Sequence, residues 1–205
     1  MNKKILIIDY KVGNHQSLEN ALTFLRYDFL VSHKKEDIKK AHVCILPGVG
    51  AFGEAMKNIH ELGILDVLSE QVLVNKKPIL GICLGMQIMA DSSEEKGFHK
   101  GLGWIEGKMQ KLDEKKNIRV PHVGWNNLKI VKKNPLFKKT EENTNFYFDH
   151  SYHFVCDKPY IAAEILYGDK IVAAVQKDNI FGVQFHPEKS QNNGLKLFRS
   201  FFNYL

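Results

Sequence analysis

Cysteine is scarce in this chain of 205 residues, because it occurs only at Cys44, Cys83 and Cys156. An odd number of cysteines without close spacing indicates neither a disulfide framework nor a zinc cluster, and it fits a reducing cytoplasm. Long apolar runs are missing too, since none approaches the roughly 20 residues that a membrane-spanning helix needs. We therefore expect a cytoplasmic protein with no membrane segment and with neither a metal nor another cofactor.

A nucleic-acid-binding motif is also absent. The formal net charge is +6, and lysines gather in two clusters, within residues 34–40 and 132–139. Few aromatic side chains lie between these lysines, so the pattern does not favour nucleic-acid binding. Two interpretations stay open: the lysines lie on solvated faces, or they form a surface that attracts an acidic partner or a phosphorylated ligand.

The first part of the chain alternates between strand and helix patterns. The apolar run from Lys4 to Tyr10 is typical of a buried parallel strand. It is not read as a signal peptide, because Asp9 interrupts it and no cleavage site follows. The other expected strands cover 29–31, 43–46 and the run that begins at Pro78, and the expected helices cover 17–25, 51–59 and 62–73. This order predicts a parallel, doubly wound sheet.

From about Gly97 the pattern changes to short strands separated by turn residues, which indicates antiparallel hairpins. The expected strands cover 104–112, 118–123, 128–131, 146–148, 152–155, 161–167, 171–176 and 180–185, and a helix follows over 194–204. Neither a repeat nor a linker interrupts the chain. We therefore expect residues 1–205 to form a single three-layer α/β domain, with a mostly parallel doubly wound sheet and antiparallel strands in the C-terminal half.

One cysteine lies in a strand–turn–helix pattern. Gly81 and Gly85 bracket Cys83, which is the spacing of a nucleophile elbow with cysteine in place of serine. Glycines suit a strained turn in which backbone segments crowd, and the N-terminus of the expected helix over 86–90 favours an anionic sulfur. Cys83 is therefore a candidate nucleophile. The alternative is a structural cysteine that packs as a small apolar side chain.

A base for this thiol is found near the C-terminus. A predicted strand runs into His186, Pro187 ends that strand, and Glu188 follows. A histidine at the end of a strand can face the carboxyl edge of an α/β sheet, where active sites lie. Cys83, His186 and Glu188 would then act as nucleophile, base and orienting group. The alternative is a surface histidine and glutamate on a loop.

The loop Pro47-Gly48-Val49-Gly50 follows a predicted buried strand and precedes a predicted helix. Backbone N–H groups of Gly48, Val49 and Gly50 can face a developing oxyanion, with the N–H of Leu84 as a further donor. One alternative is a plain turn between strand and helix. The other is a phosphate-binding loop, although the Lys-Ser/Thr ending of a P-loop is missing.

Together these motifs resemble those of class I glutamine amidotransferases. The resemblance rests on the loop at 47–50, on Gly81-Ile82-Cys83-Leu84-Gly85-Met86-Gln87 and on Gly182-Val183-Gln184-Phe185-His186-Pro187-Glu188. Further segments are similar, more narrowly, to the glutaminase subunits of imidazole glycerol phosphate synthase: Asp9-Tyr10, Gly13-Asn14, His122-Val123-Gly124-Trp125-Asn126 and Tyr147-Phe148-Asp149-His150-Ser151-Tyr152. The similarity spans nearly the whole chain, with the motifs in the family's order.

The resemblance implies a glutaminase. Cys83 would attack the carboxamide of L-glutamine and form a glutamyl thioester, and His186 would protonate the departing ammonia before water releases glutamate. Gln87 and the segment His150-Ser151-Tyr152 would help to hold the substrate. The ammonia would pass to a cyclase barrel subunit, in a heterodimer that makes imidazole glycerol phosphate and AICAR in histidine biosynthesis.

The same resemblance implies a docking surface for the cyclase, at the positions Asn14, Trp125, Tyr147 and Lys189. Trp125 is either an exposed anchor of this surface or a packed core residue. The resemblance also implies that the isolated chain is nearly inactive, because the loop at Gly48–Val49 must be reoriented by the loaded partner.

Departures from the family pattern occur at Lys11, at Asp149 and over 103–107, all outside the triad, and they leave the partner open. The first alternative is a paralogous subunit that supplies ammonia for sugar amidination in surface-glycan biosynthesis. Further alternatives are a cysteine hydrolase of another substrate and a catalytically silent subunit. A metal site at His150 and His153 is disfavoured, because an extended segment would direct these side chains to opposite faces.

Overall fold

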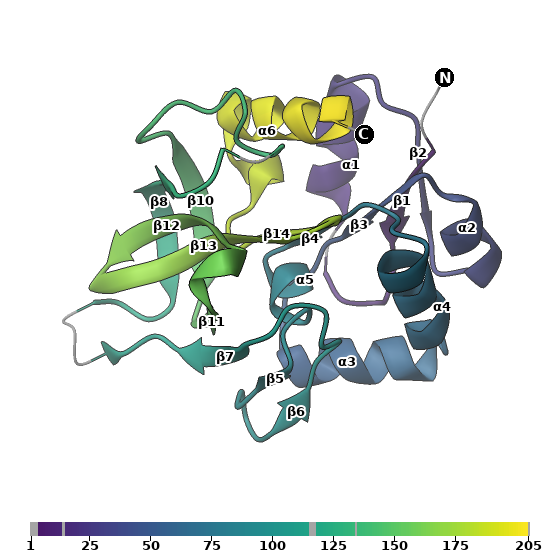
Figure 1. The fold of residues 1–205 in the computed structure, drawn as a ribbon, viewed down its shortest axis with the longest axis horizontal. Coiled ribbons are helices and arrows are strands. Elements are labelled where there is room, and N and C mark those ends of the chain that lie inside the picture. Colours follow the sequence, from purple (N-terminus) through teal and green to yellow (C-terminus); the bar gives the residue numbers. More distant parts are fainter. Residues whose placement is uncertain (1–3, 14, 115–117, 134, 205) are drawn as a thin grey trace.

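The computed structural model describes residues 4–13, 15–114, 118–133 and 135–204. Within these residues one large sheet has helices on both faces (Figure 1). Its strands follow the order β2-β1-β3-β4-β14-β13-β11-β7-β5-β6; in addition β12 pairs with β13, and β9 pairs with β12. The sheet is mixed, with parallel pairing in the N-terminal half and mainly antiparallel pairing beyond β14. This arrangement confirms the predicted α/β class.

The parallel half consists of β2 (Phe29–Ser32), β1 (Ile5–Ile8), β3 (Val43–Leu46), β4 (Ile79–Ile82) and β14 (Ile180–Val183). Every residue of β1 is buried. Ile5 and Ile7 pack with residues of α1 and α6 on one face, whereas Leu6 and Ile8 pack with residues of α3 and α4 on the other. Burial on both faces explains the continuous apolar run of this strand.

Helices cover both faces of the parallel half. One face carries α1 (Gln16–Phe24) and α6 (Gln191–Tyr204), and the other carries α3 (Phe52–Glu61) and α4 (Leu65–Ser69), with a π-helical turn at Glu70–Val74 (Figure 1). The helix expected over 17–25 begins at Gln16, directly after its N-cap His15. The helix expected over 62–73 begins only at Leu65, because α3 ends at Glu61 and Gly63 has φ +62°.

The sequence patterns do not predict α2 (Lys35–Lys40), in which only Ile38 is buried. A single apolar residue among charged ones gives no helical periodicity, so the sequence pattern does not indicate this helix. The carbonyl groups of Ile38 and Lys39, in its last turn, accept hydrogen bonds from the ammonium group of the buried Lys77. A residue distant in the sequence therefore satisfies the end of this short helix.

The antiparallel half is built around β13 (Asp169–Lys177), which pairs with β14, β12 (Ile161–Tyr167) and β11 (Tyr152–Val155). Its shorter strands are β7 (Lys108–Lys111), β5 (Ser92–Ser93), β6 (His99–Lys100) and β9 (Lys129–Ile130). The strand expected over 104–112 is shortened to β7, since Trp104 and Ile105 precede it in the core. The strand expected over 180–185 ends at Val183.

A separate two-stranded ribbon consists of β8 (His122–Asn127) and β10 (Asn145–His150), paired antiparallel. The strand expected over 118–123 begins later, at His122, and continues to Asn127. The N–H of His186 donates to the Tyr147 carbonyl of β10 at 2.8 Å, which fixes the ribbon beside the end of β14. In the described part of the chain, no helix is long and apolar enough to cross a bilayer.

Candidate active site

Cys83 occupies the sharp turn between β4 and the short helix α5 (Leu84–Gln87). Its backbone has φ +51° and ψ −109°, which is a strained conformation for an L-residue. A Cβ on Gly85 would lie 1.7 Å from the carbonyl oxygen of Leu46, and a Cβ on Gly81 would lie 2.7 Å from that of Gly85. Glycine is thus required where α5 crosses the end of β3. The sequence pattern predicts that this helix begins at Met86, but in the structure it begins at Leu84, directly after Cys83.

His186 reaches Cys83 because β14 lies beside β4. Val183 is in register with Ile82, so the ends of the two strands are adjacent. The His186 Nδ1 lies 2.7 Å from Glu188 Oε1, and the imidazole lines the same cavity as the Cys83 side chain, which is close enough to raise the pKa of His186. The structure therefore brings the three predicted triad residues together, with His186 between the thiol and the carboxylate.

The imidazole of His186 is 2% exposed, and its charge state follows from its neighbours. Burial by itself lowers the pKa of His186, but the contacts with Cys83 and Glu188 outweigh burial and raise that pKa to about 10. An imidazolium flanked by two acidic groups is electrostatically favoured in a buried site. The arrangement therefore places a strongly basic imidazole beside the Cys83 thiol, as a nucleophile–base pair requires.

A cavity of about 270 Å³ opens over the Cys83 sulfur. The predicted substrate-binding residues that line it are Val49, Gly50, Leu84, Gln87, His150, Ser151 and Tyr152, together with Cys83 and His186. Gly48 lies outside this lining, in a small hollow of about 10 Å³ behind the loop. Sequence patterns did not single out Glu95 and Pro121, which also line the cavity, because each lies in a segment without periodicity or motif.

Asp149 is a departure from the family pattern that lines the same cavity. Its side chain is exposed, whereas its backbone carbonyl lies 3.7 Å from the Cys83 sulfur. The part of Asp149 that contacts the nucleophile is therefore a backbone group that any residue supplies. The substitution at this position leaves that contact unchanged.

The loop at 47–50 does not present the expected oxyanion donors. The N–H of Leu84 donates to the Gly48 carbonyl at 3.4 Å, so that carbonyl occupies the donor expected to face an oxyanion. The Tyr10 hydroxyl donates to the Pro47 carbonyl at 2.5 Å, while the Val49 side chain is 43% exposed. The expectation that Leu84 and this loop jointly form a donor pair is wrong for this conformation, because one peptide carbonyl points the opposite way.

Two buried histidines support the wall of the cavity. His150 Nδ1 lies 2.8 Å from the Tyr152 carbonyl, and His150 Nε2 lies 3.2 Å from His122 Nδ1. A carbonyl only accepts, so His150 Nδ1 carries the proton, and His122 Nδ1 must donate to the bare Nε2. His122 is also stacked on Tyr167, with ring centroids 3.8 Å apart. These hydrogen bonds require one tautomer of each histidine, and they hold the His150–Tyr152 segment that lines the cavity.

This histidine pair predicts acid sensitivity. Burial lowers the pKa of His150 to about 3 and that of His122 to about 4, from an ordinary 6.5. The unfolded chain therefore takes up protons below pH 6.5 that the folded protein does not, so stability is complete above pH 6.5 and falls toward pH 4. Each histidine contributes a slope of about 1.4 kcal/mol per pH unit in that window.

Urea unfolding between pH 5.0 and 7.0 checks this prediction. We expect His122→Phe to reduce the pH slope of the unfolding free energy by an amount that corresponds to about one proton. The control is His60→Asn at an exposed position, which should leave the slope at the wild-type value. Equal slopes for wild type and His122→Phe would contradict the assignment.

Two of the expected docking residues, Trp125 and Tyr147, lie on the β8–β10 ribbon, and Lys189 lies in the turn after His186. Trp125 is 44% exposed, which rules out a packed core position, and its ring lies edge-on to Tyr147 at 6.1 Å. The Lys189 ammonium lies 5.8 Å from the Tyr147 ring centre. Val123 is exposed on the same strand. The fourth expected residue, Asn14, lies outside the described residues.

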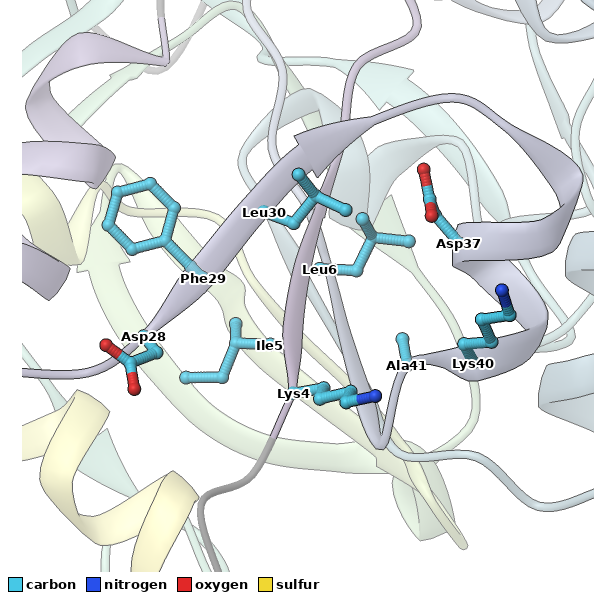
Figure 2. Close-up of a pocket in the computed structure, with 9 residues that line it drawn as sticks. All are labelled: Lys4, Ile5, Leu6, Asp28, Phe29, Leu30, Asp37, Lys40 and Ala41. Atoms are coloured by element: carbon cyan, nitrogen blue, oxygen red, sulfur yellow. The ribbon is translucent and has the colours of Figure 1, made fainter.

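A further hollow of about 320 Å³ lies at the opposite end of the parallel strands, on or beside β1, β2 and α2 (Figure 2). It is lined by Lys4, Ile5, Leu6, Asp28, Phe29, Leu30, Asp37, Lys40 and Ala41. This lining has neither a thiol nor an imidazole. The candidate thiol and imidazole lie instead at the carboxyl ends of β4 and β14, the usual location of active sites in open α/β sheets.

Comparisons with known proteins agree with this geometry. Residues 6–204 match the family model described as glutamine amidotransferase class-I. The chain is 49% identical to the imidazole glycerol phosphate synthase subunit HisH 1 of Campylobacter jejuni, over 96% of this chain and 98% of that protein. It is 48% identical to the HisH 2 subunit of Vibrio vulnificus, over 98% and 95% of the two chains.

A solved structure shows the same fold at lower identity. The structure of PurLQS from Thermotoga maritima matches with a TM-score of 0.76 and 20% identity, over 100% of this chain and 99% of that one. The family match and the long, closely similar relatives confirm the resemblance drawn from the motifs. The chain therefore belongs to the class-I glutamine amidotransferase family.

Proposed function

We propose that this chain is the HisH glutaminase subunit of imidazole glycerol phosphate synthase, acting in the cytoplasm as a single amidotransferase domain. The observation that carries the proposal is the contact of His186 with both Cys83 and Glu188 at the floor of a cavity large enough for glutamine. Relatives between 43% and 49% identical, named as HisH subunits, support the histidine pathway and do not favour the sugar-amidination alternative.

The reaction has two halves. The Cys83 thiolate attacks the side-chain carbonyl carbon of L-glutamine, the C–N bond breaks, and His186 gives its proton to the departing ammonia, which leaves a glutamyl thioester. Water then loses a proton to His186 and attacks the thioester, the C–S bond breaks, and glutamate leaves. Glu188 holds the imidazole in the tautomer that both halves need.

The lining of the cavity suits glutamine. Glu95 accepts the Phe52 N–H at 2.7 Å and carries the charge that complements an α-ammonium group. The backbone of His150, Ser151 and Tyr152, supported by the histidine pair, supplies a fixed polar wall. Gln87 borders the cavity from α5.

The closed loop at 47–50 supports a gated enzyme. While the Gly48 carbonyl accepts the Leu84 N–H, a developing oxyanion would face a carbonyl instead of donors. Docking of a HisF-type cyclase on Trp125, Tyr147, Lys189 and Asn14 would reorient this loop, and the ammonia would enter the cyclase to form imidazole glycerol phosphate and AICAR. The exposed ring of Trp125, edge-on to Tyr147, is suited to such an anchor.

Glutamate release tests this function under three conditions: the chain alone, the chain with the organism's histidine-pathway cyclase, and both with the nucleotide substrate of the cyclase. We expect stimulation on the order of 10²-fold in the third condition, the effect of one regained oxyanion donor. Labelling of Cys83 by a glutamine-analogue alkylator is measured in parallel.

Each other outcome has a defined meaning. Strong activity of the isolated chain would overturn the gate. Labelled Cys83 without stimulation by the cyclase would overturn the histidine-pathway role and favour sugar amidination. Absence of both labelling and hydrolysis in the loaded complex would indicate a silent subunit, and preference for another substrate in a panel would indicate a different cysteine hydrolase.

A further inference from the structure

Two buried carboxamide side chains lie beside Cys83. Gln184 directly follows β14 and is 0% exposed, and Gln87 ends α5 and is 7% exposed. Gln87 Nε2 lies 3.1 Å from Gln184 Oε1, and Gln184 Nε2 lies 3.6 Å from the Cys83 sulfur. The three side chains therefore form a continuous polar chain that ends on the candidate nucleophile.

The Tyr152 carbonyl sets the direction of this chain. It lies 3.2 Å from the nitrogen of the Gln87 carboxamide, and a carbonyl only accepts hydrogen bonds. Gln87 therefore presents its NH₂ group to both Tyr152 and Gln184. Gln184 must accept this hydrogen bond through its side-chain oxygen, so its own NH₂ group points toward the Cys83 sulfur. Reversal of the Gln184 amide alone would oppose two NH₂ groups.

We infer that Gln184 is a further catalytic residue, which donates an Nε2–H hydrogen bond to the Cys83 thiolate, and that Gln87 is the positioning residue that orients it. A donor to an ionised acceptor in a buried site is stronger than one between neutral groups. The helix dipole adds little here, because α5 has only four residues. Gln184 stabilises the anion without bringing a charge that competes with His186.

The donor acts whenever negative charge is on sulfur. Before attack, it shares the thiolate charge with the His186 imidazolium. In the second half of the reaction, the adduct of water and thioester collapses, the C–S bond breaks, and the electron pair returns to sulfur, where the Gln184 N–H lies. The inference rests on the proposed glutaminase only for this second step, since thiolate stabilisation exists without substrate.

Alkylation by iodoacetamide tests the donor independently of glutamine. The reagent forms an S–C bond with Cys83 and releases iodide, and its rate follows the thiolate fraction. Gln184→Met keeps a similar length and removes the donor. We expect it to slow labelling of the Cys83 peptide about tenfold at pH 7 and to move the half-maximal pH upward by about one unit. Mass spectrometry of that peptide separates Cys83 from Cys44 and Cys156.

The matched control is Gln176→Met on β13, whose side chain faces Asp178 instead of the nucleophile and whose labelling should equal that of wild type. A Gln184→Met profile that superimposes on wild type would overturn the inference. If Gln184→Met does not fold, Gln87→Met decides, because loss of orientation predicts labelling slowed several-fold and a packing role predicts no change. The labelling rate of Cys83 can be measured even if the chain does not hydrolyse glutamine, so failure of this inference is distinguishable from failure of the proposed function.

Discussion

Replacement of Cys83 with alanine is expected to lower glutamine hydrolysis by the partner-loaded protein about 10⁴-fold or more. The side chain is the one thiol that contacts His186 and lines the cavity, so the variant retains the base but has no atom to form the thioester. Glutamate release by the complex with the cyclase and its nucleotide substrate measures the loss. Ammonia supplied directly should still support the cyclase reaction.

The matched control for this variant is Cys156→Ala. Cys156 is partly buried, and burial raises the pKa of its thiol to about 12, so it is a poor nucleophile at neutral pH. Its removal should leave glutamate release within about twofold of wild type. Thermal unfolding of both variants near the wild-type temperature would show that the fold is intact. More than a tenth of wild-type activity in Cys83→Ala would refute the nucleophile.

Replacement of Gly85 with alanine is expected to destabilise the fold by more than about 3 kcal/mol, the upper range for overpacked sites. The new Cβ would lie 1.7 Å from the Leu46 carbonyl oxygen, about half of a normal contact distance. That oxygen belongs to β3, a central strand, and cannot move without breaking the parallel sheet. Urea unfolding, or loss of soluble protein, measures the effect.

Gly63→Ala provides the control for Gly85→Ala. Gly63 has φ +62°, but its nearest neighbour to a new Cβ is the flexible Lys35 ammonium at 3.7 Å. The expected cost is about 1 kcal/mol for the left-handed conformation alone. Similar unfolding free energies for the two variants would mean that α5 can withdraw from β3, and the close approach that aims Cys83 at the cavity would then be unnecessary.

Local patterns accounted for much of the fold. The strand Val43–Leu46 and the strands Tyr152–Val155 and Ile161–Tyr167 have the predicted bounds, because apolar runs and turn residues act within a few positions. The helix α2 was missed because one buried isoleucine carries no period, and the ribbon strand β8 was misjudged because its exposed residues extend through Trp125. Both errors concern segments that tertiary contacts hold in place.

The family, the α/β class and the candidates Cys83, His186 and Glu188 could be predicted from the sequence alone, since glycine spacing around a turn and a strand-ending proline are local signals. Three features required the folded chain instead: β14 lies beside β4, the Gly48 carbonyl accepts the Leu84 N–H, and Gln184 directs an N–H to the sulfur. The reason is physical: hydrogen-bond direction depends on which acceptor a distant segment supplies, as the Tyr152 carbonyl does for Gln87.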